Sequence, residues 1–419
     1  MSHLTRFVTD CPCGRPHICP IRAVEIGEGA LSSLPSLCGG FTRILLVADT
    51  NTYAACGREV DGILGGLVAS RHIFAGEGVV IPDEASVEAI EGKLTPDTDL
   101  IVGVGSGVIN DLCKYVSHKN RLPYVIVATA PSMDGYASAG AAMILGGMKV
   151  TVSAGVPAAI IADTDVLKEA PMEMILAGYG DIVGKYSALN DWKLSRVINE
   201  EYFCQEIYDL TFHMVHKTIE ISDGLLLRRE ESVRTLMEAL VIVGIAMSFA
   251  GSSRPASGSE HHLSHFFEIT GIVHKQAYFP HGVDVAYSTV VTAWLREELL
   301  KRPWPETQYR PEREEYLAQL SRIYGPVAQE CAKLQDKVGL YKKDMLSVYR
   351  QKEAQIRQVL AEMPSAERIR QLLEKVGLHM YCFRSMYSDD KIRDAISYAK
   401  ELKDRYTVLW MYYDLFGGQ

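Results

Sequence analysis

Short, wholly apolar runs recur along the first part of the chain, and they constrain the fold more than any other feature. The runs are residues 41–49, 98–103, 122–129 and 158–163, each rich in Val, Ile and Leu and bounded by turn residues. Continuous apolar runs of this length are typical of strands that are buried on both faces, as in a parallel sheet covered by helices. The sequence therefore predicts an N-terminal α/β domain.

The pattern changes to helical periodicity from Met172 onward. Helices are expected over residues 172–197, 232–250, 284–301, 342–361, 365–376 and 389–404. Pro303 and Pro305 end one of them. We expect an α/β domain of the nucleotide-binding type over residues 1–168, followed by an all-helical domain over 169–419.

Composition excludes several classes of partner. With 47% hydrophobic and 23% charged residues, the chain of 419 residues resembles a folded enzyme. A net charge of −9 argues against nucleic acid and against an anionic membrane as partners. No leader and no apolar run long enough to span a bilayer is apparent, so we expect no membrane insertion. Nine cysteines, mostly single and in apolar contexts, favour thiols in a cytoplasmic protein.

An N-terminal cluster of cysteines, Cys11-Pro12-Cys13-Gly14-Arg15-Pro16-His17-Ile18-Cys19, could in principle hold zinc. It lacks a second pair of cysteines, and a single local cluster does not easily enclose a tetrahedral ion. An ordinary extended segment is therefore the favoured interpretation.

A glycine-rich turn, Gly103-Val104-Gly105-Ser106-Gly107, follows the second apolar run and opens a helix. Glycines let backbone amides approach a pyrophosphate, which the helix N-terminus stabilises. Val108 stands where a standard dinucleotide motif has its third glycine, so a purely structural turn stays open. Asp49, at the end of the first run, could accept hydrogen bonds from a ribose, or could simply cap a helix or turn.

A polar loop follows the third apolar run, at Thr129-Ala130-Pro131-Ser132-Met133-Asp134-Gly135-Tyr136-Ala137-Ser138. Loops at the carboxyl ends of parallel strands bind ligands in α/β proteins. The hydroxyls of Thr129, Ser132 and Ser138 suit a cofactor, and Asp134 suits a substrate hydroxyl. Alone, this segment indicates no more than a turn.

Histidines gather in Gly258-Ser259-Glu260-His261-His262-Leu263-Ser264-His265, and His281 follows. His261 and His265 share a helix face, and neutral imidazole is a common metal ligand. Asp181 stands among helix-weakening glycines and could complete a catalytic divalent site. The alternative is a set of polar histidines at helix interfaces.

Together these motifs carry a family resemblance. GVGSGVIND, TAPSMDGYAS, AGYGDIVGKYSALNDWKLS, GSEHHLSH and PHG occur in the order found in sn-glycerol-1-phosphate dehydrogenases. The chain resembles the bacterial, AraM-type branch, within the dehydroquinate synthase and iron-containing alcohol dehydrogenase superfamily. The similarity covers nearly the whole chain, from CPCGRPH to KDRYTVL.

The resemblance implies a Rossmann-like, dinucleotide-binding domain over residues 1–168 and a helical metal- and substrate-binding domain over 169–419, with the active site in the cleft between them. It also implies roles for particular residues. Asp181, His261 and His281 would be metal ligands, Asp134, Asp181 and His265 would bind substrate, and Asp181 and His265 would be catalytic. The cofactor would contact Gly103, Val104, Gly105, Ser106, Gly107, Thr129, Ala130, Pro131, Ser132 and Ser138, besides Asp49. His262 and His274 compete for ligand positions. Val108 departs from the family, where threonine is frequent.

The activity implied is reduction of dihydroxyacetone phosphate by NAD(P)H to sn-glycerol 1-phosphate, a precursor for glycerophospholipids. It would depend on one divalent metal, zinc or nickel, and Asp49 favours NAD over NADP. The partners expected are a small phosphorylated three-carbon substrate and a second copy in a homodimer. Alternatives are a cyclising carbon–oxygen lyase of the dehydroquinate synthase kind, a glycerol dehydrogenase, and a catalytically silent NAD-binding protein. Lys149, Lys185 and Arg254 could donate to the phosphate, but none is assigned.

Overall fold

The computed structural model describes residues 10–76, 78, 80–146 and 148–417. The chain divides into two compact units, one of residues 1–179 with 216–252 and one of 180–215 with 253–419. The first unit thus extends beyond the expected boundary at residue 168. It includes helix α10 (Glu230–Ala250), whose Val233, Met237 and Val241 belong to the core beside the sheet. An apolar helix face is buried where it finds apolar partners, whatever its position along the chain.

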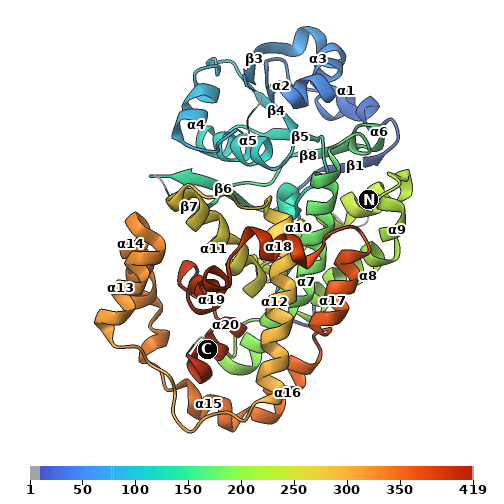
Figure 1. Ribbon diagram of the computed structural model, residues 1–419. Helices are drawn as coiled ribbons and strands as arrows, with labels where there is room; N and C mark the ends of the chain where they lie inside the picture. The colour runs from blue at the N-terminus through green and yellow to red at the C-terminus, as the bar shows by residue number, and fades with distance from the viewer. Residues whose placement is uncertain (1–9, 77, 79, 147, 418–419) are drawn as a thin grey trace. The chain divides into compact units, whose positions relative to one another are not determined.

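A six-stranded sheet forms the centre of the first unit (Figure 1). All neighbouring strands are parallel and follow the order β1-β8-β5-β4-β2-β3. The strands are β1 (Ala23–Gly27), β2 (Ile44–Asp49), β3 (Val68–Phe74), β4 (Leu100–Gly105), β5 (Tyr124–Ala128) and β8 (Ala159–Asp163). The four apolar runs became β2, β4, β5 and β8, which confirms the α/β prediction.

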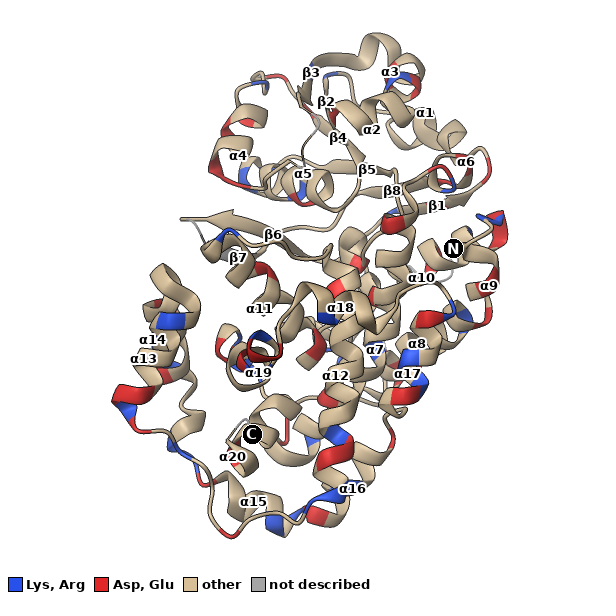
Figure 2. Cartoon of the chain, viewed as in Figure 1, with Lys and Arg blue, Asp and Glu red and all other residues tan. Residues whose placement is uncertain are grey.

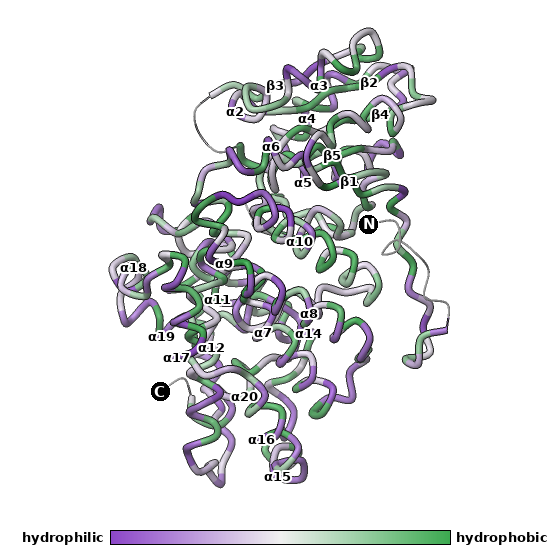
Figure 3. The backbone as a smooth tube through the Cα atoms, turned by 90° about the vertical axis from the view of Figure 1, so that its right-hand side faces the viewer, coloured by the Kyte–Doolittle hydropathy of each residue, from purple (hydrophilic) through white to green (hydrophobic). Residues whose placement is uncertain are grey.

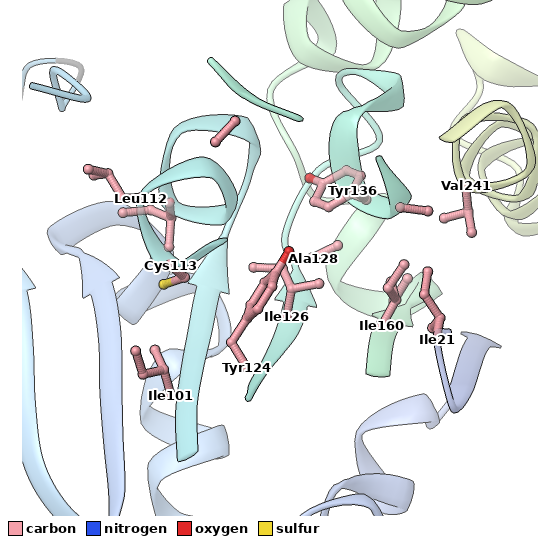
Figure 4. Packing of buried hydrophobic residues seen from close by; sticks show 14 of the residues in the cluster. Ile21, Ile101, Leu112, Cys113, Tyr124, Ile126, Ala128, Tyr136, Ile160 and Val241 are labelled. Atoms are coloured by element: carbon pink, nitrogen blue, oxygen red, sulfur yellow. The ribbon is translucent and has the colours of Figure 1, made fainter. Parts of the chain in front are cut away.

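Both faces of this sheet are covered, which explains why its inner strands are apolar throughout. On β2, Leu45 and Val47 belong to one core cluster, whereas Leu46 and Ala48 belong to another. Side chains alternate between the two faces of a strand, so a doubly covered strand needs an apolar residue at every position. Figure 4 shows part of the first cluster, and the strand segments are largely green in Figure 3.

Short helices connect the strands of the first unit. They are α1 (Leu34–Leu37), α2 (Thr50–Thr52), α3 (Arg58–Leu64), α4 (Glu84–Glu91), α5 (Gly107–Asn120) and α6 (Thr164–Leu167). Leu112 and Val116 of α5 lie in one core cluster, and Val60 and Leu64 of α3 lie in the other. Helices therefore contribute to both layers around the sheet.

Sequence patterns missed the edge strands β1 and β3 and the antiparallel pair β6 (Gly140–Leu145) and β7 (Met148–Ser153). Strand β3 reads VASRHIF, with polar residues between the apolar ones. An edge strand is exposed along one side, so it carries no continuous apolar run. Its period-2 signal over seven residues is weak beside that of the buried strands.

Among the residues that the structure describes, the second unit contains helices joined by loops and no strands. Its helices include parts of α7 (Met172–Asn199) and α8 (Gln205–Glu220), then α11 (Ser259–His274), α12 (His281–Lys301), α13 (Arg313–Tyr324), α14 (Ala328–Val338), α15 (Met345–Gln351), α16 (Glu353–Ala361), α17 (Ala366–Glu374), α18 (Met380–Met386), α19 (Asp389–Tyr398) and α20 (Val408–Phe416). The helix expected over 342–361 is two helices, because Lys352 leaves helical geometry at φ −107° and ψ 15°. Charged residues are frequent on α13, α16 and α17 (Figure 2).

Helix α10 corrects the expectation that no segment is apolar enough to cross a membrane. It has 21 residues, and its most apolar 18-residue window has a mean hydropathy of 1.7. However, 67% of that window is buried inside the protein. A core helix meets the same criteria of length and composition, and α10 is such a helix in the first unit.

Candidate functional site

Three side chains that could bind a metal ion, here called the ligand set, come together in the second unit. Asp181 lies on α7, His261 on the first turn of α11, and His281 at the first residue of α12. One ligand atom from each residue lies within 4.8 Å of the others. His261 Nε2 is 3.5 Å from Asp181 Oδ1, close to the separation of about 3.4 Å between two such ligands on a tetrahedral ion.

Two glycines of α7 explain how helices so far apart in the chain supply one site. A Cβ added to Gly180 would lie 2.4 Å from the Gly282 carbonyl oxygen, and one added to Gly184 would lie 2.5 Å from a Val285 methyl. The backbones of α7 and α12 therefore approach as closely as glycine allows. This contact holds Asp181 beside His281, and it accounts for glycines that cost helix stability.

Hydrogen bonds orient the two histidines. Glu260 Oε1 lies 2.7 Å from His261 Nδ1 and accepts the Gly258 amide at 2.8 Å. Ser264 Oγ lies 3.2 Å from His281 Nδ1. A carboxylate at Nδ1 keeps the proton on that nitrogen, which leaves Nε2 to bind a cation.

Glu260 is ionised behind His261. Its side chain is fully buried. Burial by itself raises the pKa of the Glu260 carboxyl, but the hydrogen bond from His261 and the Gly258 amide hold that pKa below its usual value. The negative charge therefore persists at neutral pH, where it strengthens the hydrogen bond from His261 Nδ1.

A buried lysine supports Asp181. Lys185 Nζ donates to Asp181 Oδ1 at 2.6 Å and to the Ala256 carbonyl oxygen at 3.0 Å, and neither Lys185 nor Asp181 is exposed. The pair spans one helical turn, so both side chains share a face of α7. Lys185, considered above as a phosphate donor, is therefore bonded to a residue of the ligand set. One carboxylate and two imidazoles fit a divalent metal ion that keeps open coordination positions.

The other histidines occupy distinct surroundings. The His265 ring centroid lies 6.3 Å from that of His261 and 5.5 Å from that of His281, so it borders the ligand set. His262 is fully buried, and in the described ranges neither ring nitrogen has a hydrogen-bond partner. Burial lowers its pKa well below the usual value. His274 Nε2 lies 2.8 Å from the Ile323 carbonyl oxygen, and His274 is not among the clustered ligands.

The expected cofactor residues follow three neighbouring strands of the first unit. Strands β2, β4 and β5 are adjacent and parallel, so their carboxyl ends share one edge of the sheet. The Thr129 amide donates to the Gly105 carbonyl oxygen at 3.1 Å, which joins the glycine turn to the polar loop. This edge is where parallel α/β sheets bind ligands.

The glycine turn also serves packing. A Cβ on Gly105 would lie 2.5 Å from Ile109 Cβ, and one on Gly103 would lie 2.8 Å from Cys113 Sγ. Val104 is buried, and Ser106 and Gly107 begin α5, where Ser106 makes no side-chain cap. Packing therefore requires these glycines, as the structural interpretation of the turn expected. The turn also places the first backbone amides of the 14-residue helix α5 at the sheet edge.

Asp49 caps a helix, as its alternative interpretation expected. Its Oδ1 accepts the Thr52 amide at 2.8 Å, and Thr52 Oγ1 accepts the Asp49 amide at 3.0 Å. This reciprocal pair is a capping box at the start of α2. A contact between Asp49 and a ribose stays a prediction.

The polar loop is largely buried and is stabilised by an internal hydrogen bond. Thr129, Ala130, Ser132, Asp134 and Ser138 are at most 9% exposed, and Pro131 is buried too. Asp134 begins a short 3-10 helix, Asp134–Ala137. Tyr136 donates its hydroxyl to the Ala130 carbonyl oxygen at 2.7 Å. The loop is therefore a rigid segment rather than a simple turn.

Lys114 is the residue of this region that sequence reasoning missed. Its Nζ, wholly buried, donates to the Gly135 and Gly140 carbonyl oxygens at 2.8 and 2.9 Å. Burial lowers the pKa of Lys114, and the nearby Asp111 carboxylate opposes that shift. The only indication of this role in the sequence is the position of Lys114, on the face of α5 that otherwise packs in the core. The phosphate-donor candidates Lys149 and Arg254 differ: the side chain of Lys149 lies outside the described residues, and Arg254 binds Glu201 at 2.7 Å.

Comparison with known proteins identifies the family. Residues 25–171 match the family model for iron-containing alcohol dehydrogenases. A glycerol-1-phosphate dehydrogenase (NAD(P)+) of Geobacillus stearothermophilus is 32% identical over 90% of this chain and 88% of the relative. One from Halalkalibacterium halodurans is 30% identical over 98% of both chains.

Solved structures support the same fold. An iron-containing alcohol dehydrogenase from Thermococcus thioreducens superposes with a TM-score of 0.61 over 96% of this chain and 99% of that one, at 15% identity. At this identity the likeness concerns the fold alone, and it confirms the expected α/β domain followed by helices. Together with the relatives above, it shows that the chain belongs to the glycerol-1-phosphate dehydrogenase family.

Proposed function

We propose that this protein reduces dihydroxyacetone phosphate to sn-glycerol 1-phosphate, with NADH or NADPH as the hydride donor and one divalent metal ion. The observation that carries the proposal is the Asp181, His261 and His281 set, within 4.8 Å, in a chain of this family. A bound divalent cation would polarise the ketone oxygen and stabilise developing negative charge. The cofactor would supply the hydride.

The chain's own residues would hold and orient that cation. Glu260 keeps the His261 ring in one orientation, and Lys185 keeps the Asp181 carboxylate in place. Their burial means that neither support is weakened by solvent. We further propose that His265, beside both histidine ligands, binds substrate and delivers the proton to the product oxygen.

At the sheet edge, we propose that the amides of Gly105, Ser106 and Gly107 bind the cofactor pyrophosphate. The 14-residue helix α5 favours an anion at its N-terminus. The loop from Thr129 to Ser138 would contact the rest of the cofactor, and Asp134 would contact the substrate. The position of the active site between the α/β and helical domains stays part of this proposal.

Further parts of the proposal concern the metal and the cellular setting. Zinc or nickel suits one carboxylate with two imidazoles. On the strength of the family, we also propose a homodimer, a cytoplasmic location and a role in supplying glycerophospholipid precursors.

The test is to follow NADH oxidation with dihydroxyacetone phosphate before and after chelation, and then to determine the chirality of the product. Turnover that is lost with chelator, restored by zinc or nickel and yields sn-glycerol 1-phosphate supports the proposal. The 3-phosphate enantiomer as product, or no turnover after metal is restored, would refute it. Turnover with glycerol in place of the phosphate ester would indicate a polyol dehydrogenase. Product formed without net NADH consumption would indicate a lyase.

A separate variant tests whether Asp181 binds the metal. Asp181→Ala should lose the catalytic metal, as measured by elemental analysis after dialysis. Asp209→Ala, which removes a carboxylate from α8 outside the ligand set, is the control and should keep it. Full metal content in Asp181→Ala would contradict the assignment without touching the proposed reaction.

A further inference from the structure

We propose that Cys11, Cys13 and His17 bind a second metal ion, a structural zinc, in the first unit. The ligand atoms of these three residues lie within 4.8 Å of one another. Cys13 Sγ is 3.4 Å from His17 Nε2. A thiolate and an imidazole bound to one tetrahedral zinc lie about 3.6 Å apart, from bond lengths near 2.3 and 2.05 Å. The side chains are thus spaced as ligands.

The hydrogen bond on the far side of His17 is a second, independent observation. His17 Nδ1 lies 3.2 Å from the carbonyl oxygen of Phe249, near the end of α10. A carbonyl oxygen can only accept, so Nδ1 carries the proton and Nε2 presents its lone pair toward Cys13. Zinc-binding histidines are oriented in this way by a carbonyl or carboxylate at the other nitrogen.

The backbone around the cysteines forms a turn suited to two ligands. The Gly14 amide donates to the Cys11 carbonyl oxygen at 2.9 Å, and Gly14 has a φ of +77°, a value that favours glycine. The turn brings Cys13 back toward Cys11. Cys11 and His17 are 7% and 1% exposed, so the pair is shielded from solvent.

Cys19 of the same segment packs in the core, in contrast to the proposed ligands Cys11 and Cys13. It belongs to the apolar core, and burial raises the pKa of its thiol. Cys11 and Cys13 are absent from that core cluster, and Cys13 Sγ faces His17 Nε2. Two thiolates and one imidazole are soft ligands that select zinc over magnesium or calcium.

The site has a structural rather than a catalytic character. It lies in the segment that leads into the edge strand β1, and through His17 it joins that segment to α10 of the same unit. The ring of His17 also packs on Phe249, with centroids 5.6 Å apart. A metal here would fasten the N-terminal segment to the core. The fourth position is filled by another cysteine of the chain or by water.

The experiment uses cobalt as a probe, because only thiolate ligands give sulfur-to-cobalt charge-transfer absorption. The full-length protein is stripped of metal and loaded with Co²⁺. The Asp, His and His set contains no sulfur, so a charge-transfer band reports on the N-terminal cluster alone. We expect the band in the unaltered protein and in Asp181→Ala. Its absence from the unaltered protein would overturn the proposal.

Substitutions then locate the ligands. Cys11→Ser with Cys13→Ser should abolish the band and lower the zinc content of the purified protein by one equivalent. Cys382→Ser is the matched control, because Cys382 is partly exposed like Cys13, and it should keep both. Serine substitution of each remaining cysteine in turn identifies the fourth ligand, or water if none matters.

Two further results would refute the site even if the double variant fails to fold. One is a Cys11–Cys13 disulfide found by peptide mass spectrometry of protein purified under reducing conditions. The other is zinc content that stays unchanged when a mercurial reagent titrates the thiols of the unaltered protein. Zinc released in step with that titration supports the proposal. Because none of these measurements uses turnover, their outcome is separate from that of the proposed reaction.

Discussion

Replacing Glu260 by glutamine should weaken metal binding without changing the ligands. Glu260 Oε1 receives two buried hydrogen bonds, from His261 Nδ1 at 2.7 Å and from the Gly258 amide at 2.8 Å. Glutamine has nearly the same shape and keeps one oxygen to accept both. What the substitution removes is the negative charge, which strengthens the hydrogen bond that orients the His261 ring.

The size of the effect follows from these two bonds. A hydrogen bond to a charged group contributes about 1.5–3 kcal/mol, against about 0.5–1.5 kcal/mol between neutral groups. Loss of the charge should therefore cost about 1–2 kcal/mol, which corresponds to a roughly 5- to 30-fold weaker Kd for the metal. Glu260→Ala removes the acceptor as well and should reach about 100-fold, the upper end for residues that orient metal-bound histidines.

The assay is a competition between the protein and a chromophoric chelator for zinc at fixed pH. Glu268→Gln is the control, because it removes the same charge from α11 about 12 Å farther along the helix. Its Kd should stay within about twofold of the unaltered protein. At saturating metal, kcat of Glu260→Gln should recover most of its value, because the ligands themselves remain. An unchanged Kd in Glu260→Gln, or an equal loss in Glu268→Gln, would refute the reasoning.

Three further predictions concern polar groups, two of them buried and one at a helix start. Lys114→Met should raise KM for NADH at least about tenfold with a smaller change in kcat, because two charge-assisted hydrogen bonds are lost, one to Gly135 of the loop and one to Gly140 at the start of β6. Lys119→Met, exposed on the same helix, should change neither. Asp49→Ala should lower the free energy of unfolding by about 1 kcal/mol in denaturant titrations. Asp49→Asn keeps the cap to Thr52 and should lower it by only a few tenths of a kcal/mol. If Asp49 also binds ribose, both variants should raise KM for NADH. The pKa of buried Asp284 is raised well above its usual value, chiefly by burial. Above about pH 4 the unfolded chain releases this proton while the folded chain keeps it, so stability falls as pH rises. Asp284→Asn should therefore raise Tm at pH 8 and leave it unchanged at pH 4, and an equal shift at both pH values would contradict this.

Much of the first unit could be read from local patterns. The buried strands β2, β4, β5 and β8 appear as apolar runs because both faces of each are covered. The edge strands and the β6–β7 pair could not be read, since an exposed side removes the apolar signal. The domain boundary was set by which apolar face α10 packs against, and periodicity does not encode that choice.

The ligand residues could be named as candidates, but their supports could not. Glu260 and Lys185 are charged residues that sequence alone would place at the surface, and both are wholly buried beside the ligand set. Their roles depend on distances of 2.7 and 2.6 Å to His261 and Asp181. The glycines of α7 signalled a close approach, but only the fold identifies α12 as the helix that comes near.

By itself, therefore, the sequence determined the α/β and helical classes, the glycine turn and the histidines worth testing. These depend on local spacing, which helix and strand geometry translate directly into faces and ends. Tertiary structure alone decided which histidine stands beside Asp181, which charges are buried behind the ligands, and that Cys13 faces His17. Such pairings join residues distant along the chain or across a turn, and only the packing of the whole unit sets their separation.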